Sequence, residues 1–104
     1  MTGWSVVVAR TAERDLAEAV LYIKDRLGNQ AAALRLLDEF ESIVADIANN
    51  PEARPLVRNA RIARLGYRWA PVGNYMAFYV ADRNSKTVTV ERLLYGRSNW
   101  SDAL

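Results

Sequence analysis

Five arginines follow one another at intervals of three or four residues in one short stretch of the chain: Arg54, Arg58, Arg61, Arg64 and Arg68. A guanidinium group is planar and can bind a phosphate or a carboxylate through two parallel hydrogen bonds. Arginines on a solvated loop or on an edge strand also deter unwanted sheet pairing. The series therefore indicates either an anion-binding surface or a protected edge, and the sequence does not choose between them.

Another arginine, Arg92, lies inside a strand-like stretch, where it alternates with the apolar residues Val88, Val90 and Leu94. The alternation predicts that Arg92 faces the helices. A buried charge must be paired or must reach solvent at the margin of the sheet. We favour an ion pair with a helix carboxylate such as Glu39; the alternative is a concave site in which Arg92 binds an anion.

The C-terminal stretch places aromatic residues on both sides of an arginine, as Tyr95, Arg97 and Trp100. Alternating rings and guanidinium groups suit single-stranded nucleic acid, because bases stack on the rings and phosphates meet the cations. Trp100 can instead close the end of the core or anchor a protein partner. We favour packing or partner binding, because a single ring near a terminus is weak evidence for base stacking.

Composition limits the remaining chemistry. The chain has neither cysteine nor histidine, which excludes disulfides, thiolate nucleophiles, imidazole bases and the usual zinc sites. We therefore expect no metal and no cofactor. Residues 1–52 hold five basic and nine acidic residues, whereas residues 53–104 hold nine basic and three acidic ones. This asymmetry predicts that the C-terminal half meets an anionic partner.

The elements that must position these groups follow from length and periodicity. The 104 residues suffice for one domain, over residues 1–104. We expect a strand over Trp4–Ala9, a helix capped by Thr11, and a second helix that Asn29 caps and Pro51 ends. Apolar residues recur at spacings of three and four in both helices, so the two should form an antiparallel hairpin with one buried side.

The remainder of the chain is strand-like. We expect a loop over residues 51–64 and then three strands, over Leu65–Ala70, Asn74–Ala81 and Thr87–Tyr95. Their connections are short enough to force antiparallel hairpins. The predicted fold class is α+β in the order β-α-α-β-β-β, with the helical hairpin on one face of a mainly antiparallel sheet. No stretch is apolar enough to span a bilayer, and we expect a cytoplasmic protein without a signal peptide.

The chain resembles the RelE/ParE family of bacterial toxins, the toxic halves of type II toxin-antitoxin modules. The resemblance runs along nearly the whole chain, in Ala12–Leu16 (AERDL), Leu27–Asn29 (LGN), Asn50–Pro51 (NP), Tyr75–Val80 (YMAFYV) and Val90–Arg97 (VERLLYGR). It implies the same β-α-α-β-β-β fold, a role in growth inhibition and plasmid stabilisation, and neutralisation by a cognate antitoxin.

The family has two branches, and the resemblance to the ParE branch is closer. RelE-like members are ribosome-dependent mRNA endonucleases, whereas ParE-like members inhibit DNA gyrase without a catalytic centre. The catalytic arginine of RelE follows a middle-strand tyrosine that corresponds to Tyr75, and here the next residue is Met76. Histidine is absent, the only lysines are Lys24 and Lys86, and Leu104 stands near the position of RelE's C-terminal tyrosine.

We therefore expect a ParE-like, non-catalytic inhibitor of gyrase. The alternative is a RelE-like endonuclease that uses Arg92 and Arg97 with Tyr79 or Tyr95 as proton carrier; a third reading is a family member that has lost toxicity. The candidate target-binding residues are Arg64, Arg68, Arg92, Arg97 and Trp100. We expect an acidic, partly disordered antitoxin that folds on the basic half, through contact residues that the sequence leaves open.

Overall fold

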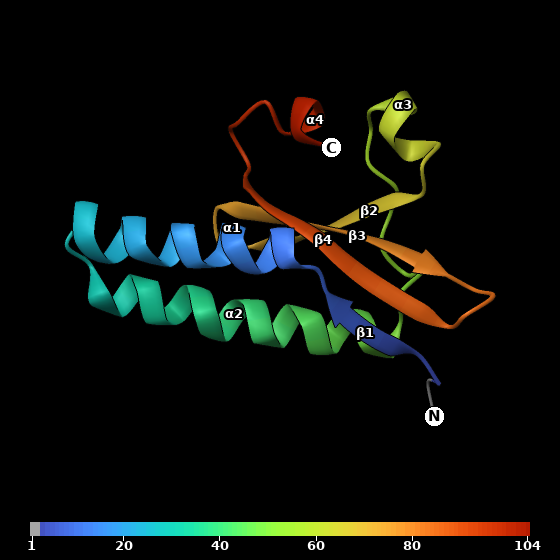
Figure 1. Ribbon diagram of the computed structural model, residues 1–104, viewed down its shortest axis with the longest axis horizontal. Helices are drawn as coiled ribbons and strands as arrows, with labels where there is room; N and C mark the ends of the chain where they lie inside the picture. Colours follow the sequence, from blue (N-terminus) through green and yellow to red (C-terminus); the bar gives the residue numbers. More distant parts are fainter. Residues whose placement is uncertain (1–2) are drawn as a thin grey trace.

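The structure, a computed structural model, describes residues 3–104. It is an α+β fold in which a helical hairpin and two short helices lie on opposite faces of a sheet (Figure 1). The elements are β1 (Ser5–Val8), α1 (Arg10–Leu21), a π-helical turn (Tyr22–Arg26), α2 (Gln30–Asn49), α3 (Ala60–Ala63), β2 (Tyr67–Val72), β3 (Tyr75–Asp82), β4 (Thr87–Tyr95) and α4 (Trp100–Ala103). The predicted order β-α-α-β-β-β is confirmed, with α3 and α4 added to it.

In the described part of the chain, the strands form one four-stranded sheet in the order β1-β4-β3-β2. β1 runs parallel to β4 and pairs with only the first part of it, Thr87–Val90. β2, β3 and β4 form an antiparallel meander. On the edge of β4 that faces away from β3, the second half of β4 therefore lies beside α1 rather than beside another strand.

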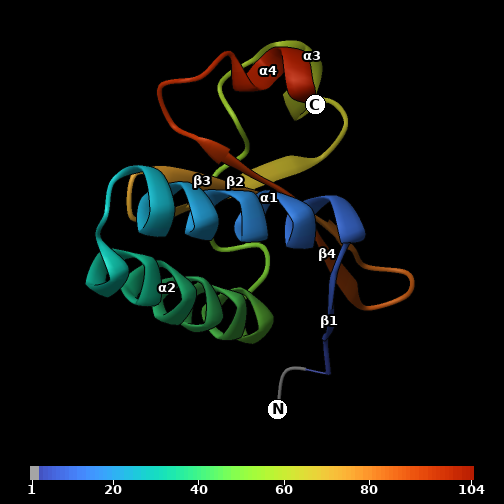
Figure 2. The same cartoon turned by 60° about the vertical axis from the view of Figure 1, so that its left-hand side comes forward.

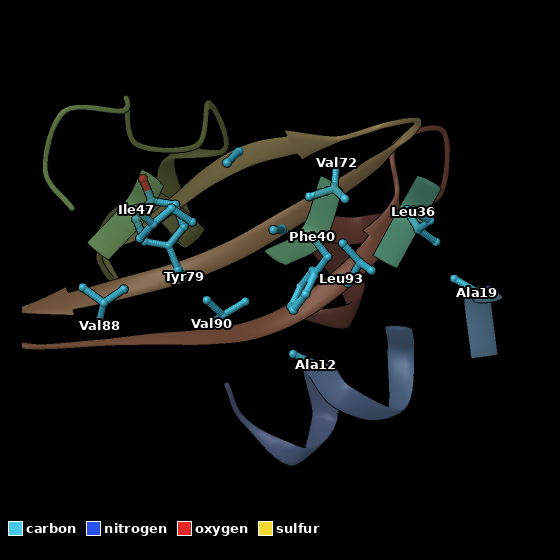
Figure 3. Close-up of a cluster of buried hydrophobic side chains, with 12 residues drawn as sticks. Ala12, Ala19, Leu36, Phe40, Ile47, Val72, Tyr79, Val88, Val90 and Leu93 are labelled. Atoms are coloured by element: carbon cyan, nitrogen blue, oxygen red, sulfur yellow. The ribbon is translucent and has the colours of Figure 1, made fainter. Parts of the chain in front are cut away.

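The main core lies between the hairpin and the sheet (Figure 3). Phe40 and Ile47 of α2 pack against Tyr79 of β3 and against Val90 and Leu93 of β4, and each of these side chains is at least 94% buried. In β3 the alternate residues Tyr75, Ala77, Tyr79 and Ala81 form the face that packs on the helices. Burying a large apolar side chain contributes about 1.5–3 kcal/mol to stability, so the burial of this layer supplies most of the free energy that stabilises the fold.

The helix starts differ in their capping. Asn29 accepts a hydrogen bond from the Ala32 N–H at 3.0 Å and caps α2, as predicted. The prediction for Thr11 is wrong: the helix begins at Arg10 with Ala9 as its cap, two residues earlier than a Thr11 cap implies, and Thr11 lies inside the first turn. The Thr11 hydroxyl instead donates to the Glu91 carbonyl of β4 at 2.6 Å. Thr11 thus ties α1 to the sheet.

The segment before the meander also differs from the prediction. Residues 60–63 form the single-turn helix α3, which Asn59 caps by accepting from the Ile62 N–H at 3.1 Å. β2 begins two residues later than expected and includes Pro71 and Val72. Pro71 fits there because β2 is an edge strand, where a missing N–H costs no ladder bond.

A β-bulge in β4 overturns the predicted direction of Arg92. Phe78 pairs with Arg92 and Tyr79 with Val90, so Glu91 has no partner of its own in β3. An extra residue in one strand shifts the alternation of side chains beyond it. Val90 and Leu93 consequently face the hairpin, whereas Leu94 faces the opposite side, together with Arg92 across from Phe78.

Candidate protein-docking face

The face of the sheet opposite the hairpin carries a second, smaller core. Its buried residues are Val57, Ile62 and Phe78, and α3 and α4 lie over it (Figure 2). The ring of Trp100 packs on Phe78 with 5.1 Å between centroids and 34° between planes. Trp69 of β2 lies directly across from Phe78 on the same face. We call this surface, with α3, α4 and the loops that flank them, the aromatic face.

Arg92 is held in place by an acidic residue of α1. Its Nε donates to Asp15 Oδ2 at 2.7 Å and its Nη2 donates to Asp15 Oδ1 at 3.1 Å. Its Nη1 donates to the Ala103 carbonyl of α4 at 3.2 Å. The Asp15 carboxylate, through these bonds, raises the pKa of Arg92 above its ordinary value. An ion pair with a helix carboxylate was the favoured prediction, and the partner is Asp15 instead of Glu39.

Asp15 also serves the backbone of β4. Its Oδ2 accepts from the Leu93 N–H at 3.0 Å, and Thr11 binds the Glu91 carbonyl on the same edge. These are backbone groups of the part of β4 that β1 does not cover. An open edge of this kind invites pairing with another chain. Here the side chains of Thr11 and Asp15, both in α1, form the hydrogen bonds that a neighbouring strand would otherwise make.

Tyr67 and Glu91 form a second polar pair at the bulge, which the sequence analysis did not identify. The Tyr67 hydroxyl donates to Glu91 Oε1 at 2.8 Å. Burial of the ring and this bond to a carboxylate together raise the pKa of Tyr67 to about 12. Tyr67 is therefore protonated near neutral pH and acts as a hydrogen-bond donor. The signal in the sequence was weak, because the two residues are far apart in the chain and meet only through the pairing of β2, β3 and β4.

The five arginines of the 54–68 series do not act as one site. Arg54 pairs with Asp46 of α2 at 2.7 Å, and Arg68 donates to the Arg54 carbonyl. Arg61 donates to the Ser101 carbonyl at 3.2 Å and so fastens α3 to α4. Arg58 and Arg64 are exposed around α3.

Of the predicted candidates, the structure brings Arg92 and Trp100 together on the aromatic face. Arg64 follows α3 and Arg97 precedes α4, and both are exposed. Within residues 3–104, neither makes an ion pair or a side-chain hydrogen bond. Arg68 is engaged with the segment that covers the edge of β2. Arg64 and Arg97 are thus the predicted cations that remain available to a partner.

A second surface lies at the tip of the hairpin and was missed by the sequence analysis. It is a groove of about 550 Å³ between the end of the hairpin and the turn between β2 and β3, lined by Tyr22, Ile23, Leu27, Asn29, Ala32, Asn74, Tyr75 and Tyr95. Leu27 is 59% exposed and Tyr22 is 51% exposed. The Tyr75 and Tyr95 rings meet edge to face at 5.5 Å. Exposed apolar grooves of this kind mark interaction sites.

The part of the chain that the structure describes contains neither a candidate metal site nor a helix that could span a membrane. Residues 3–104 contain no group of three or more carboxylates placed to hold a metal ion. None of the helices in the same range has the length and apolarity that crossing a bilayer requires. The features that stand out are surfaces rather than enclosed polar clefts.

These features define a small α+β protein whose sheet carries an acidic helical hairpin on one face and an arginine-rimmed aromatic face on the other. Comparison with known proteins gives its class. The family model described as the ParE toxin of the type II toxin-antitoxin system parDE matches residues 6–100. The chain belongs to this family, and it is the toxin of a type II toxin-antitoxin pair.

Solved structures share the fold at low sequence identity. A chain of the chromosomal ParDE toxin-antitoxin system from P. aeruginosa is 15% identical, with a TM-score of 0.71 over 91% of this chain and 98% of that one. A chain of the RelBE2 toxin-antitoxin complex from Mycobacterium tuberculosis is 22% identical, with a TM-score of 0.58 over 88% and 96%. No curated protein sequence matches. These likenesses confirm the predicted fold class.

Proposed function

We propose that this toxin inhibits DNA gyrase by binding it, without catalysis, and that a cognate acidic antitoxin neutralises it. The observation that carries the proposal is the match to a ParE toxin model over residues 6–100. The chemistry of the aromatic face supports it. Cleaving RNA at a 2′-hydroxyl needs a base for that hydroxyl, an acid for the leaving oxygen and cations for the phosphorane.

The polar groups of the aromatic face are poorly suited to these roles. Tyr67, with a pKa of about 12, stays protonated near neutral pH, so it is not available as a base, and its hydroxyl is too weak an acid to protonate a leaving oxygen efficiently. Two guanidinium nitrogens of Arg92 already donate to Asp15, and the third donates to the Ala103 carbonyl. What remains for a target is a set of exposed arginines beside apolar rings. Such a surface binds a macromolecule more readily than it performs acid-base chemistry.

Arg64 and Arg97 are the residues that we assign to the target. The test is a supercoiling assay on the double variant Arg64→Glu/Arg97→Glu. We expect its half-inhibitory concentration to rise about tenfold or more, because two favourable contacts become repulsive. Arg10→Glu, an exposed arginine on α1, is the matched control and should stay near the wild-type value. Equal inhibition by all three proteins would remove Arg64 and Arg97 from the gyrase contact.

A RelE-like mRNA endonuclease remains the alternative, and one observation favours it. Glu91 and Tyr67 lie at the same bulge as Arg92, so a carboxylate, a phenol and a guanidinium are grouped on one face. If this cluster cuts RNA, Glu91→Gln should abolish ribosome-dependent cleavage and leave the protein folded. Glu41→Gln, an exposed carboxylate on α2, is the control that should leave cleavage intact.

A further inference from the structure

The smaller core on the aromatic face is incompletely filled. A hollow of about 120 Å³ opens between β2, β3 and α4, and it is lined by Val57, Arg58, Trp69, Met76 and Trp100. An apolar cavity of about 150 Å³ is large enough to hold a benzene ring. The hollow communicates with solvent, so a single side chain from outside can enter it. We call it the Trp69–Trp100 pocket.

The lining favours a hydrocarbon side chain over a nucleic-acid base. The walls are formed by an aliphatic residue, a thioether and two indole rings, with Arg58 at the rim. A base carries several donors and acceptors on its edge, and burying these without partners costs free energy. One ring face of Trp100 is already used by Phe78, which limits stacking on it. A phenyl or leucyl group has no polar atoms to satisfy.

The segments around the pocket carry more basic than acidic side chains, although α4 contributes the exposed carboxylate of Asp102. Residues 53–68 contain five arginines and no acidic residue. Arg58 is exposed at the rim. Arg64, which follows α3, and Arg97, which precedes α4, are also exposed. The one acidic side chain of the bulge, Glu91, is occupied by Tyr67. An apolar hole with a cationic rim fits an apolar side chain flanked by carboxylates.

We propose that the Trp69–Trp100 pocket receives an apolar side chain, of the size of leucine or phenylalanine, from an acidic segment of the cognate antitoxin. The inference rests on the proposed acidic antitoxin and deepens it by naming the contact. A segment bound here also covers part of the aromatic face, whose flanking segments carry Arg64 and Arg97, the residues that we assign to gyrase. The antitoxin then neutralises the toxin by covering the surface that the target needs.

The first test measures the affinity of the toxin for the complete antitoxin encoded beside it. Val57→Phe puts a ring into the pocket from the inside, and Arg58→Glu reverses the charge at its rim. We expect each variant to weaken the affinity about tenfold or more. Arg10→Glu, on the opposite layer, makes the same change of charge and should alter the affinity by less than threefold.

Folding is checked for every variant by its thermal midpoint. Arg58 is exposed, so Arg58→Glu keeps the test open if Val57→Phe fails to fold. Wild-type affinity in Arg58→Glu and in a folded Val57→Phe would overturn the proposal. The affinity is read without gyrase, so a toxin that leaves gyrase untouched contradicts the proposed function alone.

The second test uses two defined peptides, Ac-Glu-Glu-Phe-Glu-Glu-NH2 and Ac-Glu-Glu-Ala-Glu-Glu-NH2, as competitors of the antitoxin. The phenylalanine peptide should bind about tenfold more tightly, and its binding should change the fluorescence of Trp69 and Trp100. Equal binding of the two peptides would show that charge alone acts and would contradict an anchored side chain. Displacement of the phenylalanine peptide by a single-stranded oligonucleotide, but not by the antitoxin, would make the pocket a nucleic-acid site.

Discussion

Asp15 accepts three hydrogen bonds from two neighbouring residues of β4. It binds two nitrogens of Arg92 and the backbone N–H of Leu93. Its side chain is 12% exposed and that of Arg92 is 28% exposed, so solvent screens the pair only in part. The pair joins the first turns of α1 to the strand, and through the Ala103 carbonyl it also reaches α4.

Removing this carboxylate should therefore be costly. We expect Asp15→Ala to lower the free energy of unfolding by about 2 kcal/mol, because a partly buried guanidinium and a backbone N–H lose their partner together. Urea denaturation measures the change. The control is Asp46→Ala: Asp46 also pairs with an arginine, but its side chain is 63% exposed. That change should cost about 0.5 kcal/mol or less, and equal losses would contradict the assigned role of Asp15.

The raised pKa of Tyr67 should make the free energy of unfolding decrease as the pH rises through the alkaline range. Its pKa of about 12 in the folded protein lies above the ordinary value of 10, so the folded chain keeps a proton that the unfolded chain releases. The contribution is complete below pH 10 and is lost as the pH rises towards 12.

We expect the free energy of unfolding of the wild type to fall between pH 10 and 12 by about 1 kcal/mol more than that of Tyr67→Phe. Urea denaturation at a series of pH values measures both curves. Tyr22→Phe, at a tyrosine that is 51% exposed, should follow the wild type. Parallel curves for wild type and Tyr67→Phe across this range would contradict the account.

At the scale of elements, the periodic segments could be predicted from the sequence and the irregular ones could not. The apolar spacing of the hairpin and the alternation in β3 each reflect a face that is buried along its length. The four-residue helix α3 is too short to show a period. The bulge at Glu91 arises from the pairing of β3 with β4, which is a tertiary property. The direction of Arg92, and the choice of Asp15 over Glu39 as its partner, depend on that bulge.

The sharp connection between α1 and α2 depends on Asn29. Its side chain satisfies the Ala32 N–H, one of the donors that a helix start leaves without a partner. We expect Asn29→Ala to lower the free energy of unfolding by about 1 kcal/mol. Asn50→Ala, at the other end of α2, is the control, because the Asn50 side chain makes no hydrogen bond within residues 3–104. Thermal or urea unfolding that ranks the two variants equally would contradict the capping role.

At the scale of the whole molecule, charge and architecture divide in the same way. The acidic half of the chain supplies the hairpin, and the basic half supplies the meander, α3 and α4 (Figure 1). The sequence predicted this division because its charges change sign near the end of α2. The sequence did not predict that the aromatic face is hollow, since Val57, Trp69 and Trp100 meet only through the fold.

The central claim is that this toxin acts on gyrase by binding and leaves RNA intact. The most direct measurement adds the purified protein to a gyrase supercoiling reaction and, in parallel, to a translating ribosome system with labelled mRNA. The account predicts that supercoiling stops at toxin concentrations comparable to those of gyrase, that antitoxin restores it, and that the mRNA stays full length. Cleaved mRNA together with undisturbed supercoiling would contradict it.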